Sequence, residues 1–188
     1  MTVLDKAIIF ATKAHSGMFR KGTNIPYIVH PLEAAAIAAT MTVDENVIAA
    51  AVLHDVIEDT PTTNEQLEIE FGKRVAELVC ADSENKREEL PAAETWEIRK
   101  QETLDYIPTA SRDEQIIILS DKLSNLRSIY RDYITMKDEL WNKFNVKDKS
   151  KHCWYYSGIA KALNKVKDSN AFQEYIELLV AVFGFEIA

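Results

Sequence analysis

Residues 114–133 read EQIIILSDKLSNLRSIYRDY, and this stretch decides the fold class. Its opening apolar residues, 116–119, would by themselves suit a β-strand. Apolar residues then continue at three- and four-residue intervals, the period of a helix with one buried face. These residues are Leu119, Leu123, Leu126, Tyr130 and Tyr133. Ser111 or Asp113 can cap the start of such a helix. We therefore predict a long, buried helix over 114–133.

The rest of the chain also favours helices, separated by short runs of Gly, Pro and polar residues. A loop is expected at 19–29, and a long polar connection is expected at 82–94. The other predicted helices cover 3–15, 32–41, 44–59, 63–72, 73–80, 96–107, 148–166 and 169–183. No internal repeat or linker divides the sequence. It therefore predicts an all-α fold, a helical bundle in which residues 1–188 form a single domain.

Composition and charge limit the class of partner. The 188 residues are 47% hydrophobic and 28% charged, as in ordinary globular proteins. The net charge of −8 argues against binding to long nucleic acids or anionic membranes, although a pocket with local positive charge could still take a small anion. Two cysteines, Cys80 and Cys153, and the lack of a leader or spanning segment lead us to expect a cytoplasmic protein. The sequence does not indicate the oligomeric state.

Four ionisable residues interrupt the apolar pattern at the end of the predicted helix 44–59. They are His54, Asp55, Glu58 and Asp59, which share one side of an ideal helix. Carboxylates crowded together resist desolvation unless a cation compensates them. The alternative interpretation is a helix end that emerges into water, with hydrated carboxylates.

Two further polar residues lie in apolar surroundings. Asp121 lies between Leu119 and Leu123, where a buried carboxylate is costly unless it is paired or bound to metal. His30 precedes Pro31, which we expect to hold the backbone of His30 in the extended region. Asn125 follows Asp121 by four residues and shares its helix face, although a satisfied core amide would look the same.

Together these residues offer two imidazoles and two hard oxygen ligands. That donor set suits Mn²⁺, Fe²⁺ or Zn²⁺ better than Ca²⁺. We therefore predict a metal site formed by His30, His54, Asp55 and Asp121. Glu58 and Asp59, one turn further along, would be available for acid–base chemistry.

The order of these residues resembles the H…HD…D pattern of the HD-domain metal-dependent phosphohydrolases. The segments 20–31 (RKGTNIPYIVHP), 53–60 (LHDVIEDT) and 121–125 (DKLSN) resemble the hydrolase domain of the RelA/SpoT-type alarmone enzymes of the stringent response. The similarity covers about 15–127. Because the chain has no room for synthetase and regulatory domains, it is most similar to a stand-alone small alarmone hydrolase.

This resemblance implies an all-helical HD bundle and a reaction. In the family, a Mn²⁺-bound water hydrolyses the 3′-pyrophosphate of (p)ppGpp, giving GDP or GTP and pyrophosphate; other divalent transition metals also suit the ligands. The implied metal ligands are His30, His54, Asp55 and Asp121. The implied acidic catalytic pair is Glu58 and Asp59. The implied substrate contacts are Arg20, Lys21 and Asn125.

Other basic and aromatic residues are weaker candidates. The aromatic run 154–156 is flanked by lysines and could form a wall for a nucleotide, with Tyr155 preferred, although aromatic residues at this spacing are also typical of a core. Lys86, Arg87, Arg99 and Lys100 could reach the substrate from the polar connection and the helix after it. Arg127 lies about 240° around the helix from Asp121, so it should point away from the metal.

Three other functions remain open from the sequence. The chain could hydrolyse another nucleotide, for example as a phosphomonoesterase, but the Arg20–Lys21 pair together with Glu58 and Asp59 favours a pyrophosphorylated nucleotide. It could be a non-catalytic nucleotide sensor, against which the complete set of metal and acidic positions argues. It could also be a structural helical protein with a surface acidic cluster.

Overall fold

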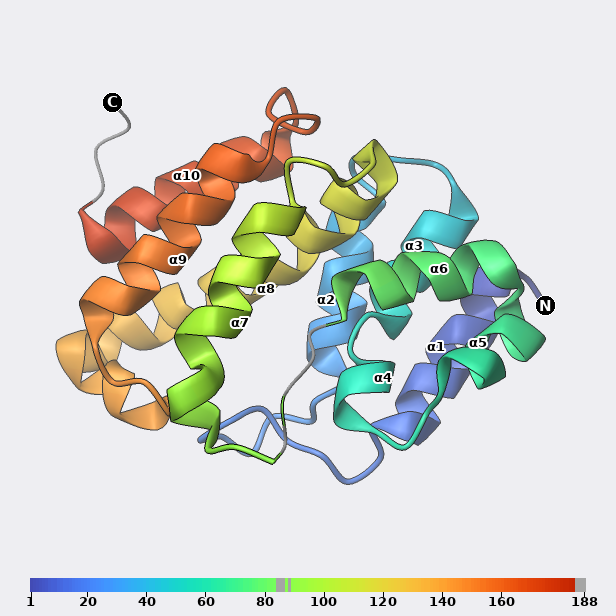
Figure 1. Cartoon of the computed structure of the whole chain (residues 1–188), viewed down its shortest axis with the longest axis horizontal. Coiled ribbons are helices and arrows are strands. Elements are labelled where there is room, and N and C mark those ends of the chain that lie inside the picture. The colour runs from blue at the N-terminus through green and yellow to red at the C-terminus, as the bar shows by residue number, and fades with distance from the viewer. Residues whose placement is uncertain (84–86, 88, 185–188) are drawn as a thin grey trace.

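The computed structural model describes residues 1–83, 87 and 89–184, and these form helices and loops (Figure 1). Within these ranges the only β-type pairing is an isolated bridge between Phe19 and Pro26, so the all-α prediction is confirmed. The α-helices are α1 (Val3–Ala14), α2 (Val29–Ala38), α3 (Glu45–Leu53), α4 (Val56–Asp59), α5 (Asn64–Phe71), α6 (Lys73–Asp82), α7 (Ala92–Tyr106), α8 (Arg112–Met136), α9 (Lys149–Ala162) and α10 (Asn170–Phe183). A 3₁₀-helix, η1 (Lys137–Lys143), follows α8.

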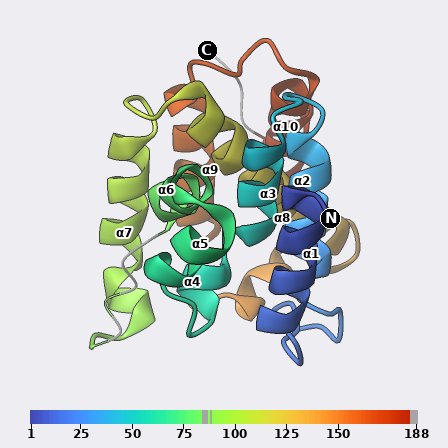
Figure 2. The same cartoon turned by 90° about the vertical axis from the view of Figure 1, so that its right-hand side faces the viewer.

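The long helix α8 is the centre of the packing. It begins at a capping box, in which the Ser111 hydroxyl accepts from the Glu114 amide and the Glu114 carboxylate accepts from the Ser111 amide. It packs against α2, α3, α6, α10 and η1. Figure 1 shows α9 and α10 on one side of α8 and α1 and α3 on the other, and Figure 2 shows α7 and α1 at opposite edges of the molecule. The isoleucines at 116–118 and Leu119 are almost fully buried, as the helix prediction required.

One cluster of buried hydrophobic side chains runs through the described residues from α1 to α10. It includes Ala11, Leu53, Leu119, Ile159 and Leu179. No helix in the described part of the chain combines the length and the apolarity needed to cross a bilayer.

The predicted helix 44–59 is broken into two, α3 and α4, at His54 and Asp55. The ring Nδ1 of His54 donates to the carbonyl of Ala51 at 2.8 Å, and in an unbroken helix this carbonyl would accept from the Asp55 amide. The prediction of one continuous helix was therefore wrong. The break turns Asp55 and the start of α4 toward α2 and α8.

The expectation for His30 was also wrong, because His30 lies in the first turn of α2 and not in extended backbone. Pro31 is the third residue of α2, where the amide hydrogen that proline lacks would have no partner within the helix. The bias that Pro31 places on the preceding residue is thus overridden, and the first turn directs His30 toward α8.

Candidate metal centre and adjoining pockets

Four predicted ligands from three parts of the chain converge at the junction of α2, α3, α4 and α8. The Nε2 atoms of His30 and His54 lie 3.2 Å apart. His30 Nε2 lies 3.1 Å from Asp121 Oδ1, and His54 Nε2 lies 2.9 Å from Asp55 Oδ2. Ligands that bind one ion at about 2.1 Å lie about 3.0–3.4 Å apart in octahedral or tetrahedral geometry. The donor atoms of His30, His54 and Asp121 also lie within 4.8 Å of one another, so the spacing fits one divalent ion.

The ring orientations of both histidines fit a metal. Nδ1 of His54 faces the Ala51 carbonyl, which can only accept a hydrogen bond, so this nitrogen carries the hydrogen. Nδ1 of His30 lies 2.8 Å from the hydroxyl of Ser124. Both Nε2 atoms therefore face each other and two carboxylates in a site where the histidines are 2–3% exposed. Such a group of lone pairs and negative charges requires a cation or a proton among them.

The electrostatics of the site also favour positive charge. Burial alone would lower the pKa of His54, but the carboxylates of Asp55 and Asp121 raise that pKa well above its usual value. Burial alone would raise the pKa of Asp121, but Lys122, His30 and His54 hold it well below its usual value. Both carboxylates in the site are thus held ionised, the form that binds a metal ion.

A further set of hydrogen bonds connects the metal ligands to the loop before α2. The hydroxyl of Tyr27 donates to Asp55 Oδ2 at 2.7 Å. Burial, with the nearby Asp55 and Asp59 carboxylates, raises the pKa of Tyr27, so this phenol remains a donor. The guanidinium carbon of Arg20 lies 5.6 Å from the centre of the Tyr27 ring, and its NH2 donates to Asn125 Oδ1 at 2.6 Å. Asn125 in turn donates to Asp121.

Three of the ligands, His30, Asp55 and Asp121, line a cavity of about 250 Å³ that carries charges of both signs. Its acidic residues are Asp55, Glu58, Asp59 and Asp121. Its basic residues are Arg20, Arg99, Lys100 and Lys122. Arg99 and Lys100 come from α7, so two of the weaker candidates reach the site; Arg87 instead pairs with Glu102, and Lys86 lies outside the described residues.

A second cavity of about 280 Å³ adjoins the first and shares Arg20, Tyr27 and Asn125 with it. Lys21 lines this second cavity, and its ammonium group donates to Asn145 at 2.7 Å. The other residues lining it are Thr23, Ile25, Ser128, Ile129, Arg131, Asp132, Lys143, Phe144 and Tyr156. Together, the two adjoining cavities offer a compartment lined mainly by charged residues next to one lined by charged, polar and apolar residues.

The structure places Tyr155 away from the linings of both cavities. Its side chain is 4% exposed and packs edge-on against Trp96, with the Lys100 ammonium 4.8 Å from its ring centre. Its neighbour Tyr156 lines the second cavity. Tyr155 thus lies behind a cavity-lining lysine, and its substrate contact stays a prediction.

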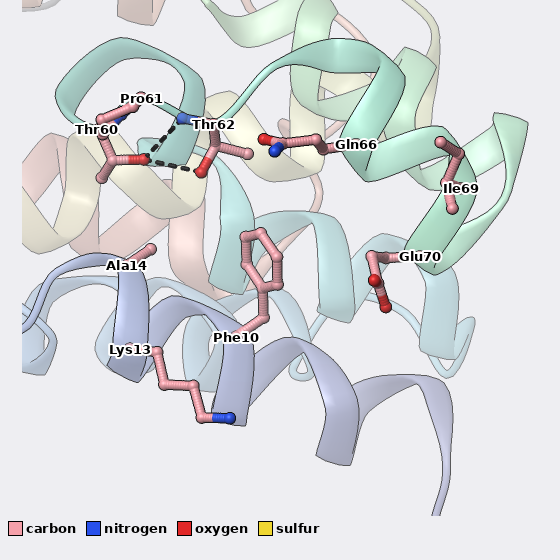
Figure 3. Close-up of a pocket in the computed structure, with 9 residues that line it drawn as sticks. All are labelled: Phe10, Lys13, Ala14, Thr60, Pro61, Thr62, Gln66, Ile69 and Glu70. Carbon is pink, nitrogen blue, oxygen red and sulfur yellow. Dashed lines mark hydrogen bonds between the residues drawn. The ribbon is translucent and has the colours of Figure 1, made fainter.

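A larger cavity lies elsewhere, between α1, α5 and the turn at 60–62 (Figure 3). It measures about 580 Å³. Phe10 and Lys13 line it from α1, with the Phe10 ring pointing into it, and Gln66 and Ile69 line it from α5. Its lining holds none of the predicted site residues and no convergent group of buried ionisable side chains among the described residues. Because chemistry needs such groups, the smaller bipolar cavity is the candidate site.

Sequence reasoning missed Tyr27, Lys122, Ser124 and Glu33, which surround the ligands. Tyr27, Lys122 and Ser124 lie inside the motif segments, so proximity in sequence could have flagged them. Glu33 shows no such signal, because its role depends on the contact between α2 and α8.

Comparison with known proteins identifies the family. Residues 7–144 match the model of the family described as "HD domain". The chain is 33% identical over 98% of its length to guanosine-3′,5′-bis(diphosphate) 3′-pyrophosphohydrolase MESH1 of Danio rerio, of which it covers 96%. It is also 38% identical, over 67% of its length, to the bifunctional (p)ppGpp synthase/hydrolase SpoT of Escherichia coli K12, but there it spans only 18% of the relative's length.

Solved structures show the same likeness. A crystal structure of a protein from Listeria monocytogenes EGD-e superposes with a TM-score of 0.73 at 32% identity, covering 83% of this chain and 99% of that one. A metazoan ortholog of SpoT that hydrolyzes ppGpp superposes with a TM-score of 0.71 at 25% identity, covering 95% and 94% of the two chains. The family match over residues 7–144 and the near full-length relative show that this chain belongs to the HD domain family.

Proposed function

We propose that this protein is a divalent-metal-dependent phosphohydrolase that removes the 3′-pyrophosphate of (p)ppGpp, giving GDP or GTP and pyrophosphate. The observation that carries the proposal is the convergence of the Nε2 atoms of His30 and His54 with the carboxylates of Asp55 and Asp121, beside a cavity that basic side chains also line. The relative from Danio rerio, which has the same length range as this chain, is named for this reaction. Residues 1–188 would act as a single HD phosphohydrolase domain.

HD domains depend on divalent metals, and the ligand set favours a transition metal here. We assign His30, His54, Asp55 and Asp121 as the ligands and Mn²⁺ as the ion, because two imidazoles with two carboxylates suit Mn²⁺ and leave coordination positions for water and substrate. When bound, the ion would lower the pKa of a water molecule and polarise a phosphoryl oxygen.

Residues of α4 would carry out the proton transfers of the reaction. Glu58 and Asp59 line the cavity beside Asp55. Glu58 would orient the attacking water and accept its proton, and Asp59 would assist proton transfer to the leaving 3′ oxygen. The water oxygen would bond to the phosphorus nearest the ribose as the bond from that phosphorus to the 3′ oxygen breaks. The 3′ oxygen would take a proton and become the 3′ hydroxyl of GDP or GTP, and the pyrophosphate released would carry the water oxygen. Tyr27 keeps its proton and holds Asp55 in place.

The two cavities suit the two ends of such a substrate. The pyrophosphate would occupy the 250 Å³ cavity, where Arg20, Arg99, Lys100 and Lys122 offset its charge. The nucleoside would extend past Arg20 and Asn125 into the 280 Å³ cavity beside Lys21. Tyr155 would act on the substrate through the Lys100 ammonium above its ring. Because the positive charge is local, an overall charge of −8 does not prevent binding of a small nucleotide.

The proposal concerns a small nucleotide as the partner and the cytoplasm as the location. Both cysteines, Cys80 and Cys153, are free thiols in the structure, as expected for a reducing compartment. The chain spans only 18% of the length of the Escherichia coli relative, so the synthase activity in that relative's name is not part of the proposal.

The direct test is to incubate the purified protein with ppGpp, with and without Mn²⁺, and to separate the products by anion-exchange chromatography. We expect equal amounts of GDP and pyrophosphate, formed only with metal. Release of inorganic phosphate from another nucleotide, without turnover of ppGpp, would instead identify a phosphomonoesterase. Tight binding of ppGpp with no product from any nucleotide would identify a sensor.

A further inference from the structure

The imidazole of His30 is held from behind by a chain of hydrogen bonds that leads away from the cavity. Its Nδ1 lies 2.8 Å from Oγ of Ser124. The Ser124 hydroxyl donates to Oε2 of Glu33 at 2.7 Å. The other oxygen of that carboxylate, Oε1, accepts from NH1 of Arg127 at 3.2 Å. The chain therefore joins α2, which carries His30 and Glu33, to α8, which carries Ser124 and Arg127.

This series of hydrogen bonds ends on α10. Arg127 donates through Nε and NH2 to the two oxygens of Glu174, each at 2.6 Å. This two-bond geometry fixes the plane of the guanidinium and leaves NH1 directed at Glu33. The C-terminal helix thus contributes to the position of Glu33, although Arg127 itself points away from the metal ligands as the sequence predicts.

The donors and acceptors along the chain determine where the His30 proton lies. A serine hydroxyl has one hydrogen, and an ionised carboxylate can only accept. Because Glu33 is ion-paired with Arg127 and takes the hydrogen of Ser124, the Ser124 oxygen must accept from His30 Nδ1. The neutral imidazole therefore carries its hydrogen on Nδ1, and the lone pair of Nε2 faces His54 and Asp121.

We propose that Ser124 and Glu33 are positioning residues that hold His30 in the metal-binding tautomer, and that Arg127, itself held by Glu174, keeps the Glu33 carboxylate in place. The inference rests on the proposed function only in taking His30 as a metal ligand. It assigns roles to Ser124, which lies inside the motif segment 121–125, and to Glu33, Arg127 and Glu174, which lie outside the quoted motif segments.

The exposure of the side chains increases along the series of hydrogen bonds from Ser124 to Glu174. We therefore expect substitutions to weaken metal binding less with each step away from Ser124. Ser124 is 1% exposed, whereas the Glu33, Arg127 and Glu174 side chains are 24%, 32% and 39% exposed. Loss of a partner that orients a metal-binding histidine typically weakens metal binding about 10–100-fold. We expect that loss for Ser124→Ala, a smaller loss for Glu33→Gln, and a change within about threefold for Glu174→Gln, since water screens exposed pairs.

The protein contains a matched control position for the substitution of Ser124. Ser120 lies one turn earlier on α8 and is fully buried, but its hydroxyl donates to the Ile116 carbonyl within the same helix. Mn²⁺ is titrated calorimetrically into metal-free wild type, Ser124→Ala and Ser120→Ala. We expect Ser120→Ala to stay within about twofold of wild type, and Ser124→Thr, which keeps the hydroxyl, to recover most of the affinity.

A second measurement reads the tautomer itself. In ¹⁵N spectra of the metal-free protein, His30 should show the Nδ1–H form in wild type and in Ser120→Ala, and should shift toward the Nε2–H form in Ser124→Ala. Equal Mn²⁺ affinities and equal His30 spectra for the two alanine variants would overturn the inference. Neither measurement uses substrate, so a wild type that binds Mn²⁺ but leaves ppGpp intact would defeat the proposed function and leave this inference standing.

Discussion

Arg20 and Asn125 are 105 residues apart in sequence, yet NH2 of Arg20 donates to Oδ1 of Asn125 at 2.6 Å. The amide nitrogen of Asn125 donates in turn to Asp121. An amide is suited to this position because it accepts from a cation on one side and donates to a carboxylate on the other. One side chain thus ties the loop before α2, which carries positive charge into both cavities, to a predicted metal ligand on α8.

The first prediction concerns Asn125→Ala, which frees Arg20 and removes a donor from Asp121. Hydrogen bonds to charged groups contribute roughly 1.5–3 kcal/mol, so we expect KM for ppGpp to rise at least about tenfold. Asn46→Ala is the matched control, since Asn46 also donates to an aspartate, Asp44, but lies at the start of α3. Steady-state kinetics check this, and an unchanged KM in Asn125→Ala would refute the coupling.

The second prediction concerns Tyr27→Phe, which removes only the hydroxyl that donates to Asp55. The ring contacts with His15 and Arg20 remain. We expect Mn²⁺ affinity to fall about tenfold, because Asp55 loses a partner that orients it, with a stability loss of about 1 kcal/mol. Tyr133→Phe removes a hydroxyl that accepts from Lys149, and it should leave Mn²⁺ affinity unchanged in the same calorimetric titration.

The third prediction concerns removal of the metal. Chelation should abolish hydrolysis of ppGpp, and added Mn²⁺ should restore it. Because an ion that binds only the folded chain stabilises it, saturating Mn²⁺ should raise the Tm of wild type. At a hundredfold excess of Mn²⁺ over Kd, the free energy of unfolding should increase by about 2.7 kcal/mol. His54→Ala and Asp121→Ala should lose both the activity and the Tm increase. Full metal-dependent hydrolysis in either variant would remove that residue from the ligand set.

The sequence could predict most of the fold because the information is local. Apolar residues at helical intervals mark α8, and the capping residues Ser111 and Thr63 mark the starts of α8 and α5. The candidate ligands were equally visible, since His54 and Asp121 are ionisable groups in apolar segments. Such residues cost free energy unless something compensates them, so they stand out without any knowledge of the tertiary structure.

The remaining features depend on contacts between distant segments. The break at His54 and the helical start at His30 arise from side-chain and packing interactions that override local backbone preferences. Glu33 and Ser124 are 91 positions apart and look like ordinary polar residues until α2 packs on α8. The same holds for Tyr155 and Tyr156, because only the tertiary packing decides that Tyr155 lies against Trp96 and that Tyr156 lines the second cavity.

The fourth prediction concerns His152, which is buried between Trp141 and Phe144 with both ring centres 4.9 Å away. Its Nε2 donates to the Val146 carbonyl at 2.8 Å. Burial lowers the pKa of His152 and outweighs the opposing effects of this hydrogen bond and of Asp148. Below about pH 6.5 the unfolded chain therefore binds a proton that the folded chain does not, and stability should fall as pH decreases.

His152→Gln removes this titration but keeps a donor for Val146. The excess stability of wild type over this variant should be constant above about pH 7 and should shrink as pH falls toward 5, in urea unfolding of the metal-free proteins. Comparing two proteins at each pH cancels the contributions of the other histidines, whose surroundings do not change. Lys147→Gln serves as a control, because it replaces an exposed side chain of a type that does not titrate between pH 5 and 7, so its difference from wild type should not vary. A pH-independent difference for His152→Gln would mean that His152 binds protons equally well in the folded and unfolded chains.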